Sequence, residues 1–190
     1  MSRGHIDRGL DAVAQAAQAS KSLSGQVSQL AAHYARVLRG GGTLFFCGNG
    51  GSAADAQHIA AEYVVRYAGN RRAYSAIALT TDTSVLTAAG NDLGYEYVFA
   101  RQVEALCTAQ DLLVLHSTSG ESRNLLAAAR RARELGVPTA AFLGRGGGAL
   151  AAQVDEALVV PSDQASLVQV IHLALEHLIV ELVELELGGG

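Results

Sequence analysis

One stretch decides the fold of this chain: Leu44-Phe45-Phe46-Cys47-Gly48-Asn49-Gly50-Gly51-Ser52-Ala53-Ala54-Asp55-Ala56-Gln57-His58-Ile59-Ala60-Ala61-Glu62. Its first four residues are apolar, as in a short buried strand, and the glycines after them allow a sharp turn and a close backbone approach to a ligand. Ser52 is a good helix N-cap, and the alanine-rich run that follows favours a helix. A strand, a glycine turn and a helix N-terminus together make a site that suits an anion such as phosphate.

The same predicted helix carries a titratable pair. His58 and Glu62 are four residues apart and therefore share one face of the helix. The glycine pattern matches neither the dinucleotide fingerprint nor the P-loop, which needs a lysine after its last glycine. Taken alone, the stretch is explained equally well by a left-handed glycine turn followed by an exposed His–Glu pair, so the rest of the chain has to decide.

Composition limits the class of protein. A chain of 190 residues with 49% hydrophobic and 17% charged residues suits one domain with a sizeable core, and it leaves apolar surface for contacts between subunits. The net charge of −4 and the lack of a Lys/Arg run argue against a nucleic-acid surface. Two cysteines, Cys47 and Cys107, form no disulfide framework, which indicates a reducing cytoplasm.

Neither a signal core nor a membrane span is expected. Met1 leads into a polar segment, and we expect no apolar run that is long and charge-free enough to cross a bilayer. Residues 6–38 are predicted to be helical, with a soft break at Ser24-Gly25 and one apolar face. This helical arm is expected to pack on the domain, and contact with a second subunit is the alternative.

Strands and helices alternate along the rest of the chain. The predicted strands are residues 44–47, 75–79, 112–115, 137–143 and 156–160. The predicted helices are residues 52–67, 84–89, 95–105, 122–135 and 163–187, and Gly90-Asn91-Asp92 is predicted to end the second of them. This alternation predicts an α/β fold: a five-stranded parallel sheet flanked by helices on both faces, with an N-terminal helical arm. We expect one domain over residues 1–190, with residues 1–40 as the arm.

A second polar turn repeats the design of the first. The third strand runs into His116-Ser117-Thr118-Ser119-Gly120-Glu121-Ser122, and a helix follows. Four hydroxyls and the N–H groups of the turn suit phosphate oxygens. An ordinary ST-turn with a serine cap is the alternative. Because parallel sheets bind ligands beyond the carboxyl ends of their strands, two such turns in one chain favour a phosphate site.

The last helix holds the second set of polar residues. Gln169, His172, Glu176 and His177 lie in an otherwise apolar helix that should be buried on most sides, in part at a subunit interface. At 100° per residue, Gln169 and His177 are about 80° apart and can face one cavity, whereas His172 and His177 are about 140° apart and should not both do so. A single histidine in such a helix is more often a hydrogen-bonded core residue than a ligand.

At this point the sequence resembles a known family. Residues 47–58, residues 117–120 and the pair Gln169 and His177 are similar to the signature of the sedoheptulose-7-phosphate isomerases, or phosphoheptose isomerases, which belong to the sugar isomerase (SIS) domain superfamily. The similarity extends over almost the whole chain and includes Gly90-Asn91-Asp92. It implies a single SIS domain.

The resemblance implies a function. This is the conversion of sedoheptulose 7-phosphate to D-glycero-D-manno-heptose 7-phosphate through an enediol, an early step towards nucleotide-activated heptoses. It also implies a cytoplasmic homotetramer that acts on a small sugar phosphate and binds neither nucleic acid nor membrane. Glu62 and His177 correspond to the acid/base pair of the family. A zinc ion would be bound by His58, Glu62, Gln169 and His177. The implied substrate contacts are Asn49, Gly50, Gly51, Ser52, Glu62, Arg66, Asn91, Asp92, Ser117, Thr118, Ser119, Ser122 and Gln169.

Three residues depart from the family pattern. Ser166 stands where an aspartate is usual, His116 replaces an apolar residue, and Glu121 replaces an asparagine and adds negative charge beside the phosphate turn. They leave isomerisation of another phosphosugar open. Two other readings also stay open: a non-catalytic tetramer that binds the replication initiator, whose members lack the Glu and His that this chain keeps, and a sugar-phosphate sensor of the kind found in transcriptional regulators.

Overall fold

The computed structural model describes residues 2–188, and a five-stranded sheet lies at its centre. The strands are β1 (Leu44–Gly48), β2 (Ala76–Ala78), β3 (Leu112–Ser117), β4 (Thr139–Leu143) and β5 (Glu156–Val159). Their order is β2-β1-β3-β4-β5, and every neighbouring pair is parallel. The predicted sheet is thus confirmed. Because the order reverses at β1, the connections place helices on both faces.

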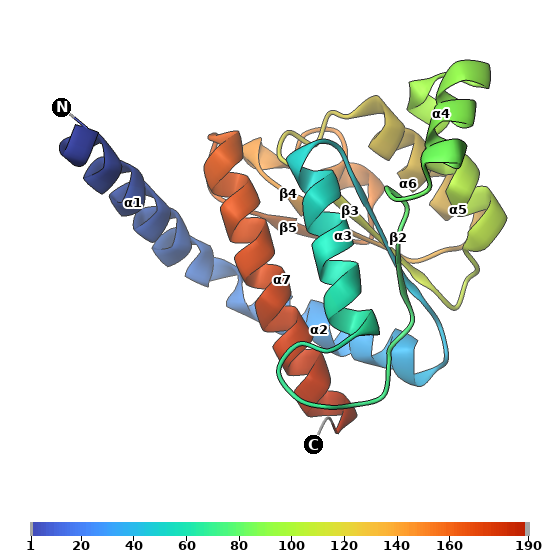
Figure 1. Cartoon of the computed structure of the whole chain (residues 1–190), viewed down its shortest axis with the longest axis horizontal. Helices are drawn as coiled ribbons and strands as arrows, with labels where there is room; N and C mark the ends of the chain where they lie inside the picture. Colours follow the sequence, from blue (N-terminus) through green and yellow to red (C-terminus); the bar gives the residue numbers. More distant parts are fainter. Residues whose placement is uncertain (1, 189–190) are drawn as a thin grey trace.

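Helices cover both faces of the sheet, and the first helix extends away from it as an arm (Figure 1). The α-helices are α1 (Ser2–Ala19), α2 (Ser24–Arg39), α3 (Gly51–Val64), α4 (Thr83–Asp92), α5 (Ala100–Leu106), α6 (Arg123–Leu135) and α7 (Ala165–Leu187). Short 3₁₀ turns are η1 (Ser20–Leu23), η2 (Tyr95–Tyr97), η3 (Arg145–Gly147) and η4 (Ala151–Gln153). α2, α3 and α7 lie on one face, and α5 and α6 lie on the other.

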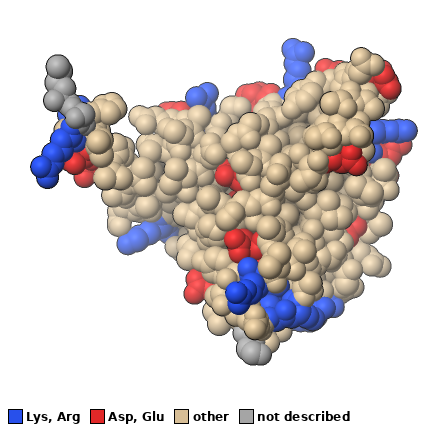
Figure 2. Space-filling model, in the orientation of Figure 1, with Lys and Arg blue, Asp and Glu red and all other residues tan. Residues whose placement is uncertain are grey.

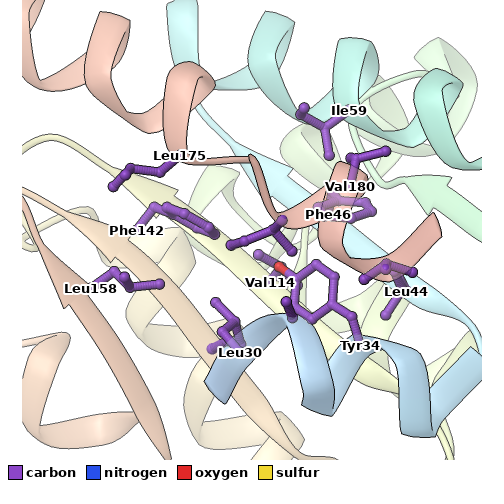
Figure 3. Packing of buried hydrophobic residues seen from close by; sticks show 14 of the residues in the cluster. Leu30, Tyr34, Leu44, Phe46, Ile59, Val114, Phe142, Leu158, Leu175 and Val180 are labelled. Atoms are coloured by element: carbon purple, nitrogen blue, oxygen red, sulfur yellow. The ribbon is translucent and has the colours of Figure 1, made fainter. Parts of the chain in front are cut away.

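The alternation of side chains along each strand produces two cores. In β1, Leu44 and Phe46 join the core beneath α2, α3 and α7, whereas Phe45 and Cys47 join the core beneath α5 and α6. Figure 3 shows the first core, where Phe46 lies near Tyr34 and Val180. Burying a side chain of this size contributes roughly 1.5–3 kcal/mol. The two cores therefore determine which residues of each strand face which layer of helices. They also determine the level in the sheet at which each strand ends.

The break in the N-terminal helical region lies one turn earlier than predicted. Residues Ser20–Leu23 form the 3₁₀ turn η1, and α2 begins at Ser24 instead of breaking there. The hydroxyls of Ser20, Ser22 and Ser24 donate to the carbonyls of Ala16, Ala19 and Lys21. Such side-chain bonds compete with the helical ladder, which explains why the tighter turn forms at the serines.

Three other helix boundaries were also predicted wrongly. Gly90-Asn91-Asp92 lies within α4 and does not end it, because one glycine costs a helix only about 1 kcal/mol. The helix predicted over residues 95–105 is the 3₁₀ turn η2 followed by α5. Ser52 lies inside α3, whose N-cap is Gly50. Asp82 is the N-cap of α4, and its side chain accepts a hydrogen bond from the Val85 N–H at 3.0 Å.

The expectation about membrane spans needs one correction. α7 is long and apolar enough, by length and composition, to cross a membrane. Its buried face packs into the first core through residues such as Val168, Ile179 and Val183, and it also buries the polar side chains of Glu176 and Glu184. Packing within the domain therefore accounts for much of its apolar character.

Candidate active site

The two polar turns lie side by side at the carboxyl edge of the sheet. In the register of β1 and β3, Gly48 pairs with His116, so the glycine turn after β1 and the hydroxyl turn after β3 leave the sheet at the same level. This is where a parallel sheet with a reversal of strand order binds ligands. The prediction that both turns share one edge is confirmed.

The glycine turn brings α7 against the start of α3. Gly50 has φ 56° and ψ −121°, a conformation that a residue with a side chain rarely adopts. A Cβ atom on Gly51 would lie 2.3 Å from Nε2 of Gln169, so the Gln169 amide packs directly against the Gly51 backbone. A side chain at residue 51 would therefore displace the Gln169 amide from its present position.

Three titratable side chains converge between α3 and α7. His58 Nε2 lies 3.0 Å from His177 Nε2 and 3.4 Å from Glu62 Oε1. The ligand atoms of these three residues all lie within 4.8 Å of one another. His58 is exposed, while Glu62 and His177 are half-buried. The structure thus joins the pair predicted on α3 to a histidine 115 residues beyond Glu62.

This cluster has donors that suit a metal ion. Two imidazole nitrogens and a carboxylate oxygen that face one point are common ligands of zinc. Gln169 lies two turns before His177 on α7 and could add an oxygen. His172, on the same helix, points elsewhere: it is buried, and its Nε2 lies 3.1 Å from the Leu143 carbonyl. The prediction that His172 and His177 diverge is confirmed.

An aromatic ring completes the surroundings of His177. Tyr67 stacks on the His177 imidazole, with centroids 5.4 Å apart and planes 20° apart. His58 meets the same imidazole edge-on, at 5.1 Å and 87°. The sequence did not single out Tyr67, because it lies at the predicted end of the first helix after the glycine turn, outside every motif; in the structure that helix, α3, ends at Val64.

The hydroxyl turn is held by its own serines. Ser117 Oγ accepts a hydrogen bond from the Gly120 N–H at 2.9 Å, and Ser119 Oγ accepts one from the Glu121 N–H at 3.2 Å. Ser122 is the N-cap of α6, and its side chain makes no capping bond. Together with half-buried Thr118, the hydroxyl of Ser122 and the first N–H groups of α6 form a set of donors at a helix N-terminus.

An amide network links the two turns. Asn49 and Asn124 exchange two side-chain hydrogen bonds, with Asn49 Nδ2 at 2.9 Å from Asn124 Oδ1 and Asn124 Nδ2 at 2.8 Å from Asn49 Oδ1. The Tyr95 hydroxyl donates to Asn49 Oδ1 at 3.1 Å. Asn49 was predicted as a substrate contact, whereas Asn124 and Tyr95 were not predicted. No sequence signal could have found these partners, because the contacts exist only after folding.

Glu121 turns towards a neighbouring loop. Its Oε1 accepts a hydrogen bond from the Ala149 N–H at 2.8 Å, and the Leu150 N–H donates to the Gly120 carbonyl at 3.0 Å. A Cβ on Gly148 would lie 2.4 Å from the Ser119 carbonyl oxygen. The glycines at residues 146–148 therefore allow this loop to pack tightly against the hydroxyl turn.

Three predicted substrate contacts have local partners. Arg66 is exposed, and its Nη1 donates to Asn70 Oδ1 at 3.1 Å. Asn91 Nδ2 donates to Asp92 Oδ1 at 2.7 Å, and both residues are exposed at the end of α4. Among the described residues, no hydrogen bond joins these three to the His58–Glu62–His177 cluster. The structure therefore leaves their assignment as a prediction.

A buried polar layer lies next to the site. His116 Nε2 is 2.5 Å from Glu176 Oε1, and both side chains are almost fully buried. Burial alone would lower the pKa of His116, but the Glu176 carboxylate raises it above its usual value. Burial also raises the pKa of Glu176 and of Asp55. His116, the second departure from the family pattern, is thus paired with Glu176.

Comparison with known proteins agrees with this geometry. The family model for the SIS domain matches residues 10–144. Phosphoheptose isomerase from Akkermansia muciniphila is 51% identical over 91% of this chain and 92% of the relative, and that from Bradyrhizobium sp. is 53% identical over 95% and 90%. The solved structure of phosphoheptose isomerase GmhA from Neisseria gonorrhoeae superposes with a TM-score of 0.92 at 38% identity, covering 97% of this chain and 99% of the other.

Proposed function

The chain belongs to the phosphoheptose isomerase family of SIS-domain proteins, and we propose that Glu62 and His177 carry out its reaction. It is an aldose–ketose isomerase that converts sedoheptulose 7-phosphate to D-glycero-D-manno-heptose 7-phosphate. The observation that carries the assignment of residues is the convergence of Glu62 from α3 and His177 from α7 beside His58. A carboxylate and an imidazole in one place are the groups that proton transfer between adjacent carbons needs.

Every proton that moves in the proposed steps has a named donor and a named acceptor. The Glu62 carboxylate takes a proton from C1 of the ketose, and the C–H electron pair forms the C1–C2 double bond while an N–H of the His177 imidazole gives a proton to the C2 oxygen. The result is an enediol. His177 then takes the proton from the C1 oxygen, and Glu62 returns its proton to C2, which yields the aldehyde. One carboxylate and one imidazole thus complete the reaction without a net change in their charges.

Phosphate binding is proposed for the hydroxyl turn. Thr118, Ser122 and the free N–H groups at the start of α6 offer donors without a fixed partner, and Ser117 and Ser119 hold the turn in shape. The N-terminus of α6 adds the favourable end of a helix dipole for an anion. Ser52 and the turn Asn49–Gly51 are proposed to line the sugar. Arg66, Asn91 and Asp92 are proposed to reach the substrate from the rim.

A zinc ion is the proposed metal. His58, Glu62 and His177 would hold it, and Gln169 is proposed as the fourth ligand. Such an ion would polarise the substrate carbonyl and stabilise negative charge on its oxygen.

A cytoplasmic homotetramer is the proposed assembly. A groove of about 500 Å³ lies among α1, α2 and α7, lined by residues that include Leu178, Leu182 and Leu185. Leu178 is 50% and Leu185 is 72% exposed, which favours coverage by another subunit. Charged side chains cover little of the face seen in Figure 2, which also suits contact with a second copy. Light scattering coupled to gel filtration should give four chains per particle, and a monomeric mass would refute this assembly.

One assay tests the reaction, the residues and the metal. The protein is incubated with sedoheptulose 7-phosphate in deuterated water and followed by NMR, with and without a chelator. We expect turnover with deuterium entering carbon-bound positions, and we expect the chelator to stop turnover and zinc to restore it. Glu62→Gln and His177→Ala should each abolish turnover in a folded protein.

Other outcomes point elsewhere. Near-wild-type turnover in either variant refutes the acid/base pair, and turnover unaffected by the chelator refutes a catalytic metal. No turnover in a folded, zinc-loaded protein would direct attention to another phosphosugar and to Ser166, which lies exposed in the first turn of α7.

A further inference from the structure

The segment between α3 and β2 is tied to the C-terminal half of α7. In Figure 1 this segment loops past the C-terminal end of α7. The Glu184 carboxylate accepts hydrogen bonds from the Tyr67 N–H at 3.0 Å, from the Ala68 N–H at 3.3 Å and from Arg71 Nε at 2.6 Å. The side chains of Arg71 and Glu184 are 2% and 8% exposed. We call this buried pair the Arg71–Glu184 clamp.

The clamp also holds the end of the helix that carries Glu62. Arg71 Nη2 donates to the carbonyl oxygen of Glu62 at 2.6 Å, and Nη1 donates to that of Tyr63 at 2.9 Å. The last carbonyls of a helix lack partners within the helix, and the planar guanidinium satisfies two of them at once. The Arg71 guanidinium also lies 4.2 Å from the centroid of the Tyr74 ring. A single arginine thus fixes both the loop and the backbone of Glu62.

The negative charge of Glu184 and the positive charge of Arg71 are both held by hydrogen bonds. Burial acts to raise the pKa of Glu184, but hydrogen bonds from the Tyr67 N–H and from Arg71 outweigh it and lower the pKa below its usual value. The carboxylate accepts three bonds and the guanidinium donates to it and to carbonyls. A buried ion pair whose hydrogen bonds are satisfied in this way holds one geometry, because few other arrangements satisfy both charges.

The loop held by the clamp places an aromatic ring on the imidazole of His177. Tyr67 follows Glu62 by five residues, and its backbone N–H is one of the bonds to Glu184. Its ring lies almost parallel to the His177 imidazole, and the His58 ring contacts the same imidazole edge-on. An imidazole on an exposed helix face can rotate about two bonds. Tyr67 and His58 contact the imidazole on two sides and so restrict this rotation.

We propose that Tyr67 is a positioning residue for His177 and that the Arg71–Glu184 clamp aligns both members of the acid/base pair. The clamp acts on Glu62 through its backbone carbonyl, and on His177 through the stacked ring of Tyr67. This inference rests on the proposal that Glu62 and His177 transfer protons. Its consequence is a loss in kcat with little change in KM, because the phosphate is bound at a separate turn. Displacement of a reacting group by about 1 Å can cost roughly 100-fold.

Tyr67→Leu and Tyr67→Phe form a matched pair that tests the ring. Tyr67→Leu should lower kcat roughly 10- to 100-fold with KM changed less than threefold, as is typical when the residues that orient a reactive histidine are removed. Tyr67→Phe keeps the ring and should stay within about twofold of the wild type. Arg71→Lys keeps the positive charge but loses the planar, forked set of N–H donors, and it should also lower kcat. Arg72→Lys is its control.

A spectroscopic measurement separates positioning from a general loss of structure. In protein with ¹³C-labelled histidine, the His177 ring signals, assigned with His177→Ala, should shift in Tyr67→Leu and stay in place in Tyr67→Phe, because a stacked aromatic ring shields its neighbour. Thermal unfolding should show that both variants are folded.

The outcomes distinguish this inference from the proposed function. A wild-type kcat in Tyr67→Leu, together with unmoved His177 signals, overturns the inference if Glu62→Gln is inactive. A raised KM with unchanged kcat also overturns it, because Tyr67 would then bind substrate. Turnover in Glu62→Gln instead overturns the acid/base assignment on which the inference rests.

Discussion

Replacing His116 with leucine should destabilise the protein, because the change leaves the Glu176 carboxylate buried without its partner. Glu176 is 2% exposed, its Oε1 lies 2.5 Å from His116 Nε2, and its Oε2 makes no hydrogen bond within the described residues. Removing one member of a buried ion pair costs about 3–5 kcal/mol. In a domain of this size each kcal/mol lowers Tm by about 2–4 °C, so Tm should fall by roughly 6–20 °C.

A double-mutant cycle isolates the interaction between the two side chains. Glu176→Leu alone should cost about 1–3 kcal/mol, because a neutral His116 can remain near the Cys47 carbonyl with one ring nitrogen unpaired. The double variant His116→Leu/Glu176→Leu should lie within about 2 kcal/mol of the wild type or exceed it in stability, since apolar pairs replace buried ion pairs without loss. The flanking rings of Phe46 and Phe142 already form an apolar slot for residue 116.

The pH dependence of His116→Leu has a definite sign. Burial raises the pKa of Glu176, and His116 provides the largest opposing effect, through its charge and its hydrogen bond, which the variant removes. A carboxyl whose pKa is raised on folding favours the folded state fully below its unfolded pKa of about 4.5 and loses that contribution as the pH rises through the folded value. The gap in stability between His116→Leu and the double variant should therefore widen between pH 5 and pH 8.

Urea unfolding at fixed protein concentration, repeated at three pH values, measures these quantities. A loss below 1 kcal/mol in His116→Leu, or a double variant as unstable as the sum of the single ones, would refute the idea that the pair acts as a unit.

Two further predictions concern the phosphate turn and the core. Ser119→Ala should raise KM roughly 10-fold with a smaller effect on kcat in steady-state assays, because the turn loses the hydrogen bond from the Glu121 N–H beside a bound anion. An unchanged KM in Ser119→Ala would remove the turn from the site. Burial lowers the pKa of His172 to about 4, so the unfolded chain takes up a proton first as the pH falls from 6.5. The wild type should lose roughly 3 kcal/mol more than His172→Asn between pH 7 and pH 4 in urea unfolding, and equal losses would contradict the shift.

The sheet and one helix face were predictable because their signals are local. Short apolar runs between glycine and polar turns located the five strands, and the spacing of His58 and Glu62 placed them on one face of α3. The spacing of Gln169 and His177 likewise predicted that both can face one cavity, and in the structure both lie against α3. Helix ends were less predictable, since the choice between Gly50 and Ser52 as the cap depends on how α7 packs against the turn.

The partners of the proposed site residues could not be predicted. Tyr67, Asn124 and the Arg71–Glu184 clamp join residues that are far apart in the sequence or lie in segments without a periodic pattern. Their pairing depends on where β1, β3 and α7 end in space. A single sequence contains no measure of those positions.

Buried polar contacts next to the proposed acid/base pair hold the geometry of this site. His116 precedes Ser117 of the hydroxyl turn, Glu176 precedes His177, and Arg71 binds the carbonyl of Glu62. Apolar packing tolerates small shifts and exchanges of side chains, whereas a hydrogen bond weakens steeply when its angle or length changes. The chemistry requires alignment to well under 1 Å, so directional contacts are better suited than apolar packing to hold the turn and the two helices in register. Substitutions at these contacts should therefore lower kcat by more than apolar core substitutions that cost the same stability.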